Sequence, residues 1–124
     1  MNRIENIADS SPRLSVFTIS LNHAKFLKET IESVEAQTFT DYEYIFCDGM
    51  SSDGTQDILK QYPWIQWTSE PDGEYGAFSA FCKGLERVKG EYLVQCCVSD
   101  GFLDRKWFEE AIQILDENFG SNKK

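Results

Sequence analysis

The sequence predicts an α/β fold in which strands and helices alternate and the sheet is mostly parallel. Short apolar, β-branched runs alternate with segments whose apolar residues recur at helical spacing. Loops rich in Gly, Asp, Ser and Pro separate these runs. The 124 residues suffice for one small domain, and a hydrophobic content of 41% is enough for a buried core.

The first third of the chain predicts a strand, a helix and a second strand. The run LSVFTIS at 14–20 is apolar and β-branched, which is typical of a strand. Asn22 can cap the helix that follows, which the periodicity places over about 24–36. A second strand-like run, YEYIFCD, covers 42–48. The apolar residues that recur at helical spacing in this helix are Leu27, Ile31 and Val34.

The rest of the chain repeats this alternation. The loop GMSSDGT precedes a short helix, QDILKQY at 56–62, and a third strand, WIQWTS at 64–69. The loop EPDGEYG precedes a helix over about 77–88, a fourth strand at 91–98 and a last helix over about 104–118. The residues expected to face inward from the last two helices are Phe78, Phe81, Leu85 and Val88, then Trp107, Phe108, Ala111, Ile112 and Leu115.

Composition and charge exclude several classes of function. The polar residues 1–12 predict a loose N-terminal arm, followed by one domain over 13–119 and a tail at 120–124. The net charge of −9 and the lack of a basic stripe argue against a nucleic-acid partner. No apolar run approaches the roughly 20 residues of a membrane helix, and the N-terminus is unlike a signal peptide. We therefore expect a cytoplasmic protein, with a peripheral position at the inner face of the membrane as a further possibility.

The cysteine and histidine pattern argues against a zinc site. The chain has four cysteines without a CxxC pair, and one histidine, His23, which we expect at the surface. Three of the cysteines, Cys47, Cys96 and Cys97, lie in strand-like runs. We expect these three to be buried, reduced thiols.

Polar side chains follow each predicted strand at its carboxyl end, the edge at which parallel sheets bind ligands. Asp48 and Asp100 each precede a glycine there, and the strand-end position favours ligand contact over a simple turn. For Asp72, in the sequence PDGE, a ligand contact and a turn are equally favoured. Asp53 is expected to be structural, because Asp-Gly is a turn signal and an acid suits a helix N-terminus.

Several blocks in order resemble the family 2 glycosyltransferases. SVFTISLN, then SVEAQTF, then a strand followed by DGMSSDGT match the opening motifs of that family. SEPDGEYGAFSAFCKGLERVKGEYLVQCCVSDG is similar to its next section, which contains E-x-D-x-G, N-K-G and a strand that ends in an aspartate motif. The resemblance covers about residues 13–118.

The resemblance implies a Rossmann-like GT-A fold and transfer of a sugar from a nucleotide-diphosphate sugar to an acceptor hydroxyl, in polysaccharide or glycoconjugate synthesis. The acceptor would be a glycan or a lipid-linked glycan, and Mg²⁺ or Mn²⁺ would assist the leaving diphosphate. The chain ends before the part of the family that carries the acceptor site and the catalytic base. We therefore expect a domain truncated at its C-terminus, the donor-binding half, with the base beyond this chain.

The family motifs imply roles for particular residues of this sequence. Thr18 and Ser20 would lie where the first strand meets the nucleotide, and Asp48 would contact the base or ribose. Asp72 would lie near the nucleoside and Lys83 near the phosphates. Asp100 would bind the nucleotide sugar and also serve as the metal ligand of a D-x-D-like motif. Trp64 and Trp67 are the only aromatic residues kept as candidate sugar contacts.

The chain departs from the family pattern at the metal motif, and other functions stay open. Val98 stands where the family commonly has Asp or Asn, and Gly101 where it commonly has a second Asp. The aspartate motif is therefore reduced, and the resemblance implies a metal less strongly than it implies the donor. Cys82 replaces the Asn of N-K-G. The alternatives are a module that binds a nucleotide sugar without catalysis, or an unrelated α/β domain, flavodoxin-like or regulatory, without affinity for nucleotide sugars.

Overall fold

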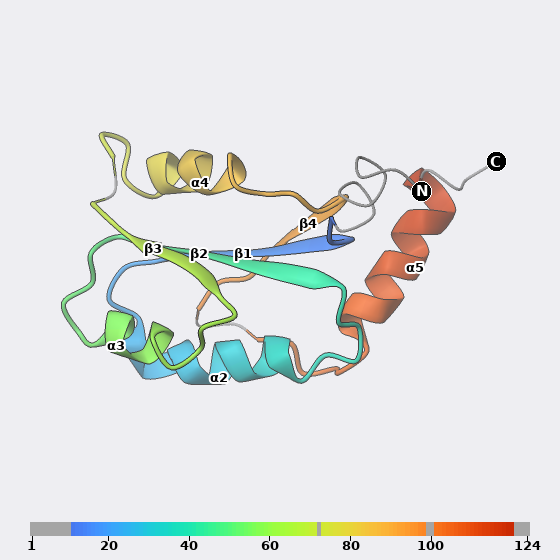
Figure 1. Ribbon diagram of the computed structural model, residues 1–124, viewed down its shortest axis with the longest axis horizontal. Coiled ribbons are helices and arrows are strands. Elements are labelled where there is room, and N and C mark those ends of the chain that lie inside the picture. Colours follow the sequence, from blue (N-terminus) through green and yellow to red (C-terminus); the bar gives the residue numbers. More distant parts are fainter. Residues whose placement is uncertain (1–10, 72, 99–100, 121–124) are drawn as a thin grey trace, which may run out of the picture.

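The computed structural model describes residues 11–71, 73–98 and 101–120, and Figure 1 shows the arrangement of their elements. The four strands form one sheet in the order β3-β2-β1-β4, and every neighbouring pair is parallel. This confirms the predicted alternation and the parallel sheet. The strands are β1 (Leu14–Ser20), β2 (Tyr42–Asp48), β3 (Gln66–Ser69) and β4 (Tyr92–Gln95). The helices are α2 (Ala24–Glu35), α3 (Thr55–Leu59), α4 (Ala77–Leu85) and α5 (Trp107–Phe119).

The two faces of the sheet are covered unequally. In Figure 1, α4 lies on one face, while α2 and α3 lie on the other and α5 stands at the end where the strands begin. The larger core lies on the α2 side, where Phe46 of the sheet, Ile31 of α2 and Phe108 of α5 are completely buried. Under α4 the buried cluster is small and comprises Phe17, Ile45 and Cys47. Successive strand residues point to opposite faces, which explains why Val16 and Phe17 belong to different clusters.

The sheet opens at the carboxyl end of β1. Strand β1 pairs with β2 along its whole length, to Ser20 and Asp48, but with β4 only as far as Phe17 and Gln95. Cys96 makes one more backbone hydrogen bond, from its N–H to the Phe17 carbonyl at 2.9 Å, and the chain then leaves the sheet. The predicted strand 91–98 is therefore too long. This divergence leaves one side of the last residues of β1 unpaired with β4.

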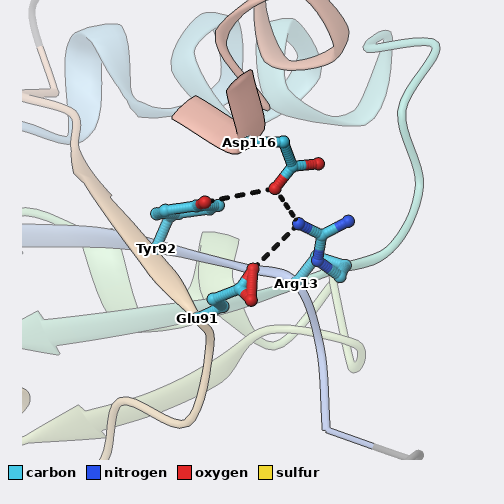
Figure 2. Close-up of polar contacts among 4 residues, drawn as sticks. All are labelled: Arg13, Glu91, Tyr92 and Asp116. Carbon is cyan, nitrogen blue, oxygen red and sulfur yellow. Dashed lines mark hydrogen bonds and ion pairs between the residues drawn. The ribbon is translucent and has the colours of Figure 1, made fainter. Parts of the chain in front are cut away.

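A polar cluster joins β1, β4 and α5 at the end of the sheet where the strands begin (Figure 2). The Arg13 guanidinium, just before β1, bonds the carboxylate of Glu91 at 2.8 Å and the carboxylate of Asp116 in α5. The Tyr92 hydroxyl donates to the same Asp116 oxygen at 3.1 Å. These bonds to Asp116 and Glu91 raise the pKa of Arg13, the bond to Asp116 contributing most. The cluster fixes α5 to the beginnings of β1 and β4.

The structure corrects several predicted helix and strand limits. The helix predicted over 24–36 ends at Glu35, and the one predicted over 77–88 ends at Leu85. Strand β3 begins at Gln66 rather than at Trp64, because residues 63–65 form a turn closed by the Ile65 N–H and the Tyr62 carbonyl. The short helix spans Thr55–Leu59 instead of 56–62. The last helix begins at Trp107, since the Asp104 side chain accepts the Lys106 N–H and ends the loop before it.

The predicted inward faces are correct for α2 and partly wrong for α4 and α5. Leu27, Ile31 and Val34 of α2 are buried, as predicted. In α4 the buried residues are Ala80 and Gly84, while Phe78 is 65% and Leu85 39% exposed. Small residues on this face allow the helix to approach the sheet closely. Phe81 and Val88 are partly buried and pack against the cluster around Phe17, as predicted. Phe108 and Ile112 of α5 are buried, but Trp107 is exposed and packs its ring on Phe102.

The structure also shows the environments of the cysteines and of the two tryptophans near β3. Cys47 and Cys96 are buried free thiols, as predicted, whereas Cys97 is exposed and the prediction that it is buried is wrong. Cys96 is still bonded to β1 through its N–H, and the chain leaves the sheet after it. Trp64 packs its ring against Tyr42 and Tyr44, and Trp67 packs against the main core. Trp64 is 38% exposed and Trp67 is half-buried, and their role as sugar contacts stays a prediction. Within the described part of the chain, no helix is long and apolar enough to cross a membrane.

Candidate functional site

The carboxyl ends of β1, β2 and β3 meet around the carboxylate of Asp48. This side chain is 2% exposed and accepts hydrogen bonds from three elements. Its Oδ2 accepts the Ser51 N–H at 3.0 Å, the Ser69 hydroxyl at 2.7 Å and the Gln56 amide at 3.3 Å. Its Oδ1 accepts the Ser51 hydroxyl. A buried carboxylate requires such donors, so Asp48 holds the ends of β2 and β3 and the start of α3 together.

A second set of hydrogen bonds ties the loop after β1 to the loop after β2. The Asn22 N–H donates to the Ser51 hydroxyl at 2.8 Å, and the Ser52 N–H donates to the Asn22 side chain at 2.9 Å. Asn22 and Met50 both have left-handed backbones, with φ of 59° and 65°. Such conformations persist where surrounding contacts determine them. The predicted cap of α2 by Asn22 is therefore wrong, because its side chain bonds the neighbouring loop.

Asp53 provides the cap that Asn22 does not. Its Oδ2 accepts the Ala24 N–H at 2.9 Å, at the start of α2, and its Oδ1 accepts the Thr55 hydroxyl at 2.6 Å, at the start of α3. The bond from the Thr55 side chain, followed by that from the Ala24 backbone, lowers the pKa of Asp53. One carboxylate thus serves two helix N-termini, and the structural role predicted for Asp53 is confirmed.

The two predicted site residues of β1 occupy different environments. The Thr18 side chain is completely buried, and its hydroxyl donates to the Cys96 carbonyl at 2.7 Å and pairs with the Tyr44 hydroxyl at 2.8 Å. Thr18 therefore joins β1 to the segment after β4 and does not reach the strand edge. Ser20 is at that edge, with its hydroxyl 3.4 Å from Nδ1 of His23. His23 is exposed at the start of α2, as predicted.

A pocket lies between the ends of β2 and β3, the loop after β3 and α4. The Lys83 side chain extends across from α4, with Nζ 3.5 Å from a Glu70 carboxylate oxygen and 3.4 Å from the Pro71 carbonyl. Lys83 is the only lysine or arginine among the described residues of this pocket. The residues that line the pocket are Cys47, Asp48, Thr68, Glu70, Pro71, Ala80 and Lys83.

A second pocket adjoins the first under α4 and shares Ala80 with it. It is largely apolar and lies beside the end of β1, where β4 has left the sheet. The residues that line it are Ile19, Ser20, Leu21, His23, Ala77 and Ala80. Ser20 lines this second pocket, whereas Asp48 and Lys83 line the first, and Ala80 of α4 borders both.

Two predicted site residues, Asp72 and Asp100, lie outside the described residues. Asp72 belongs to the loop that contributes Glu70 and Pro71, and Asp100 follows β4. Among the described residues, no three acids, histidines or cysteines converge as a metal site would require. The described strand edge therefore offers hydrogen-bond acceptors and one lysine, and does not by itself supply a set of metal ligands.

Sequence reasoning missed several members of this edge. It selected Asp48 but not Ser51 or Gln56, whose side chains bond the carboxylate, and it did not select Glu70, which pairs with Lys83. The serines that follow Asp48 are a signal for an Asx-type turn and could have identified Ser51. No local pattern indicates Gln56 or the Glu70–Lys83 pair, because their partners lie 8 and 13 positions away in sequence.

Sequence comparison identifies relatives for nearly the whole chain. The profile of the family described as "Glycosyl transferase family 2" matches residues 15–121. The putative teichuronic acid biosynthesis glycosyltransferase TuaG of Bacillus subtilis is 35% identical over 107 residues, which are 82% of this chain and 40% of TuaG. The chondroitin synthase of Escherichia coli is 31% identical over 86% of this chain and 15% of its own length. The chain thus spans well under half the length of these relatives.

Solved structures share the fold at lower identity. The mannosyltransferase PcManGT from Pyrobaculum calidifontis, in complex with GDP-Man and Mn²⁺, superposes with a TM-score of 0.76 at 22% identity, over 87% of this chain and 33% of that one. S. aureus TarS 1–349 in complex with UDP superposes with a TM-score of 0.71 at 21% identity, over 85% and 32%. These likenesses confirm the predicted GT-A fold.

Proposed function

Because the chain belongs to glycosyl transferase family 2, we propose that its strand edge holds the nucleotide part of a nucleotide-diphosphate sugar. In the whole protein this sugar is transferred to an acceptor hydroxyl in polysaccharide or glycoconjugate synthesis. The names of the relatives support this class of reaction, since they include a teichuronic acid glycosyltransferase and a chondroitin synthase. The donor class is supported by fold neighbours solved with UDP and with GDP-Man.

One observation carries the proposal: the pocket at the carboxyl edge places a buried carboxylate, Asp48, and a lysine, Lys83, around the same space. A carboxylate oxygen has two lone pairs, and Oδ1 of Asp48 accepts one hydrogen bond in the structure. It can accept another from a base N–H or a ribose hydroxyl. Lys83 supplies positive charge for the diphosphate in a chain whose net charge is −9.

The remaining assignments follow the same logic. Ser20 contacts the nucleoside from the end of β1, and Thr18 positions that strand from within the core. From the family motifs, Asp72 would contact the nucleoside and Asp100 the donor, and Asp100 would hold a divalent cation. The cation would balance charge on the diphosphate, and Mn²⁺ in the complex of PcManGT supports testing it.

Transfer itself requires one bond to form and one to break. The acceptor oxygen bonds to the anomeric carbon, the bond from that carbon to the diphosphate oxygen breaks, and the electron pair leaves with the diphosphate. The hydroxyl proton passes to a base, which we expect beyond this chain. The chain described here therefore holds and orients the donor, and binding without transfer is the second candidate function.

Calorimetric titration tests the donor site. Purified protein is titrated with UDP, GDP and UDP-sugars, with and without Mn²⁺, and the Asp48→Asn variant is compared with Asp57→Asn. Asp57 is an exposed acid on α3 whose carboxylate lies 3.9 Å from Nζ of Lys60. We expect nucleotide binding that Asp48→Asn weakens about tenfold or more, because a donor amide replaces an acceptor oxygen.

The outcomes separate the two candidate functions. Unfolding midpoints of both variants are measured first, since Asp48→Asn also disturbs the buried hydrogen bonds. Binding accompanied by release of free sugar or its transfer to an added acceptor supports the enzyme. Binding without turnover, by this chain or by a longer form of the protein, supports the binding module. If no nucleotide binds in either form, with or without Mn²⁺, both candidates are wrong.

A further inference from the structure

We propose that Glu70 competes with the diphosphate of the donor for Lys83, so that donor binding exchanges the Lys83–Glu70 ion pair for a Lys83–diphosphate contact. The inference rests on the proposed function and concerns how the same site is occupied. In the free protein Lys83 Nζ lies 3.5 Å from Glu70 Oε1 and also donates to the Pro71 carbonyl. Both charged residues line the pocket beside Asp48.

The Lys83–Glu70 ion pair is exposed and weak enough for another anion to replace Glu70. The Lys83 and Glu70 side chains are 47% and 54% exposed, so water and solutes reach both. Exposed ion pairs of this kind are weak, and the lysine chain is long and flexible. A diphosphate carries more negative charge than one carboxylate and offers more acceptor oxygens, so it is the stronger partner for the ammonium.

Lys83 is the cationic side chain that can contact an anion in these pockets. It is the only lysine or arginine lining either of the two described pockets. The next cation near this wall is Arg87, whose guanidinium contacts the Thr68 hydroxyl at 3.5 Å. Glu70 is fixed in the loop by its own N–H, which donates to the Asp48 carbonyl at 3.0 Å. This bond holds the Glu70 backbone beside the pocket, so that its side chain remains within reach of the pocket when Lys83 turns to another anion.

Two effects of Glu70 on an anionic ligand must be separated. As a competitor it lowers affinity only while Lys83 is present. As a plain negative charge it repels the diphosphate whether or not Lys83 is present. A double-variant cycle distinguishes them, because competition predicts that the gain from removing Glu70 disappears once Lys83 is removed.

The experiment measures UDP and uridine affinity by calorimetry for the full chain and for Glu70→Gln, Lys83→Met and the double variant. Glu74→Gln is the matched control, since Glu74 is an exposed acid of the same loop. We expect Glu70→Gln to tighten UDP binding about threefold and Lys83→Met to weaken it about tenfold. The double variant should equal Lys83→Met, and Glu74→Gln should equal the unaltered chain. Uridine affinity should change in none of them, because uridine has no phosphate.

Each contrary result overturns the inference in a recognisable way. If Glu70→Gln leaves UDP affinity unchanged or weakens it, Glu70 does not compete. If the gain persists in the Lys83→Met background, the effect is general repulsion. In both cases UDP still binds and the proposed function stands. If the unaltered chain binds GDP but not UDP, the same cycle is measured with GDP and guanosine. If it binds neither diphosphate, with or without Mn²⁺, the proposed function fails and the inference fails with it.

Discussion

At the scale of single residues, the carboxylates of the strand edge differ in what they do. Asp48 is buried and accepts four hydrogen bonds from three residues. Asp53 is close to solvent, yet it accepts from the start of two helices. Glu70 pairs with a lysine at the mouth of a pocket. The same carboxylate group thus has three roles. In Asp48 it joins the strand ends, in Asp53 it caps helices, and in Glu70 it forms an exposed ion pair, according to the donors around each acid.

The lowered pKa of Asp53 implies that the free energy of unfolding depends on pH. Hydrogen bonds from Thr55 and Ala24 lower its pKa in the folded protein below the ordinary value of 3.8. A lowered folded pKa means that the stabilisation is present above the unfolded pKa and is lost as pH falls through the folded one. We expect Asp53→Asn to cost about 1 kcal/mol near pH 7, since one of two acceptor oxygens is lost. The difference from the unaltered chain should shrink below about pH 4.

Urea unfolding at several pH values between 7 and 3 measures this difference. Asp57→Asn serves as control, because Asp57 is an 83% exposed acid in the first turn of α3. Unlike Asp53, it does not join the starts of two helices. Its effect should be small throughout. A difference between the unaltered chain and Asp53→Asn that stays constant from pH 7 to 3 would show that the double cap does not titrate in this range.

At the scale of elements, the approach of α4 to the sheet depends on small residues. A side-chain carbon built at Gly84 would lie 2.1 Å from the Cζ atom of Phe17, whose ring is completely buried. The same ring packs on Phe81 with centroids 5.5 Å apart. The absence of a side chain at Gly84 therefore sets how closely α4 covers β1.

Gly84→Ala should destabilise the protein although alanine favours helices. The clash forces Phe17 or the helix to move, and overpacking of this kind costs about 1–3 kcal/mol, against a propensity gain of about 1 kcal/mol. Cys82→Ala, at an exposed position of the same helix, is the control and should have little effect. Phe17→Leu should recover part of the loss in the Gly84→Ala background. A Gly84→Ala variant more stable than the unaltered chain would contradict the close packing.

At the scale of the whole molecule, the cluster in Figure 2 joins residues that are 103 positions apart in the chain. Arg13 precedes β1, Asp116 lies near the end of α5, and Glu91 and Tyr92 lie at the start of β4. Phe108 and Ile112 bury the other end of α5 in the main core. The helix is thus held by apolar packing at its beginning and by ionic bonds at its end.

Asp116→Asn should loosen the end of α5. The pair with Arg13 is partly exposed, so the loss should be about 1 kcal/mol in urea unfolding, and smaller in high salt because ions screen the attraction. Amide hydrogen exchange should increase in the last turns of α5 more than in α2. Glu117→Gln changes the charge at the next position and should have a smaller effect. Equal stability and exchange in Asp116→Asn would mean that the apolar contacts alone hold α5.

Sequence reasoning succeeded where the signal is local and periodic. The alternation of strands and helices predicted the parallel sheet, and the strand-end rule selected Asp48 and Ser20 at the edge where the pockets lie. It also identified Asp53 as structural. It was wrong about the cap at Asn22, the burial of Phe78 and Leu85, and the length of β4, because each depends on a partner from another element.

The sequence by itself determined the fold class, the family of the chain and the sheet edge that carries the candidate site, because these follow from short-range patterns and ordered motifs. Only the tertiary structure decided which side chains meet there. The Thr18 hydroxyl bonds the Cys96 carbonyl inside the core, and the Gln56 amide bonds the Asp48 carboxylate. Glu70 pairs with Lys83. The physical reason is that burial and hydrogen bonding depend on residues brought together by packing, whose separation along the chain leaves no local pattern.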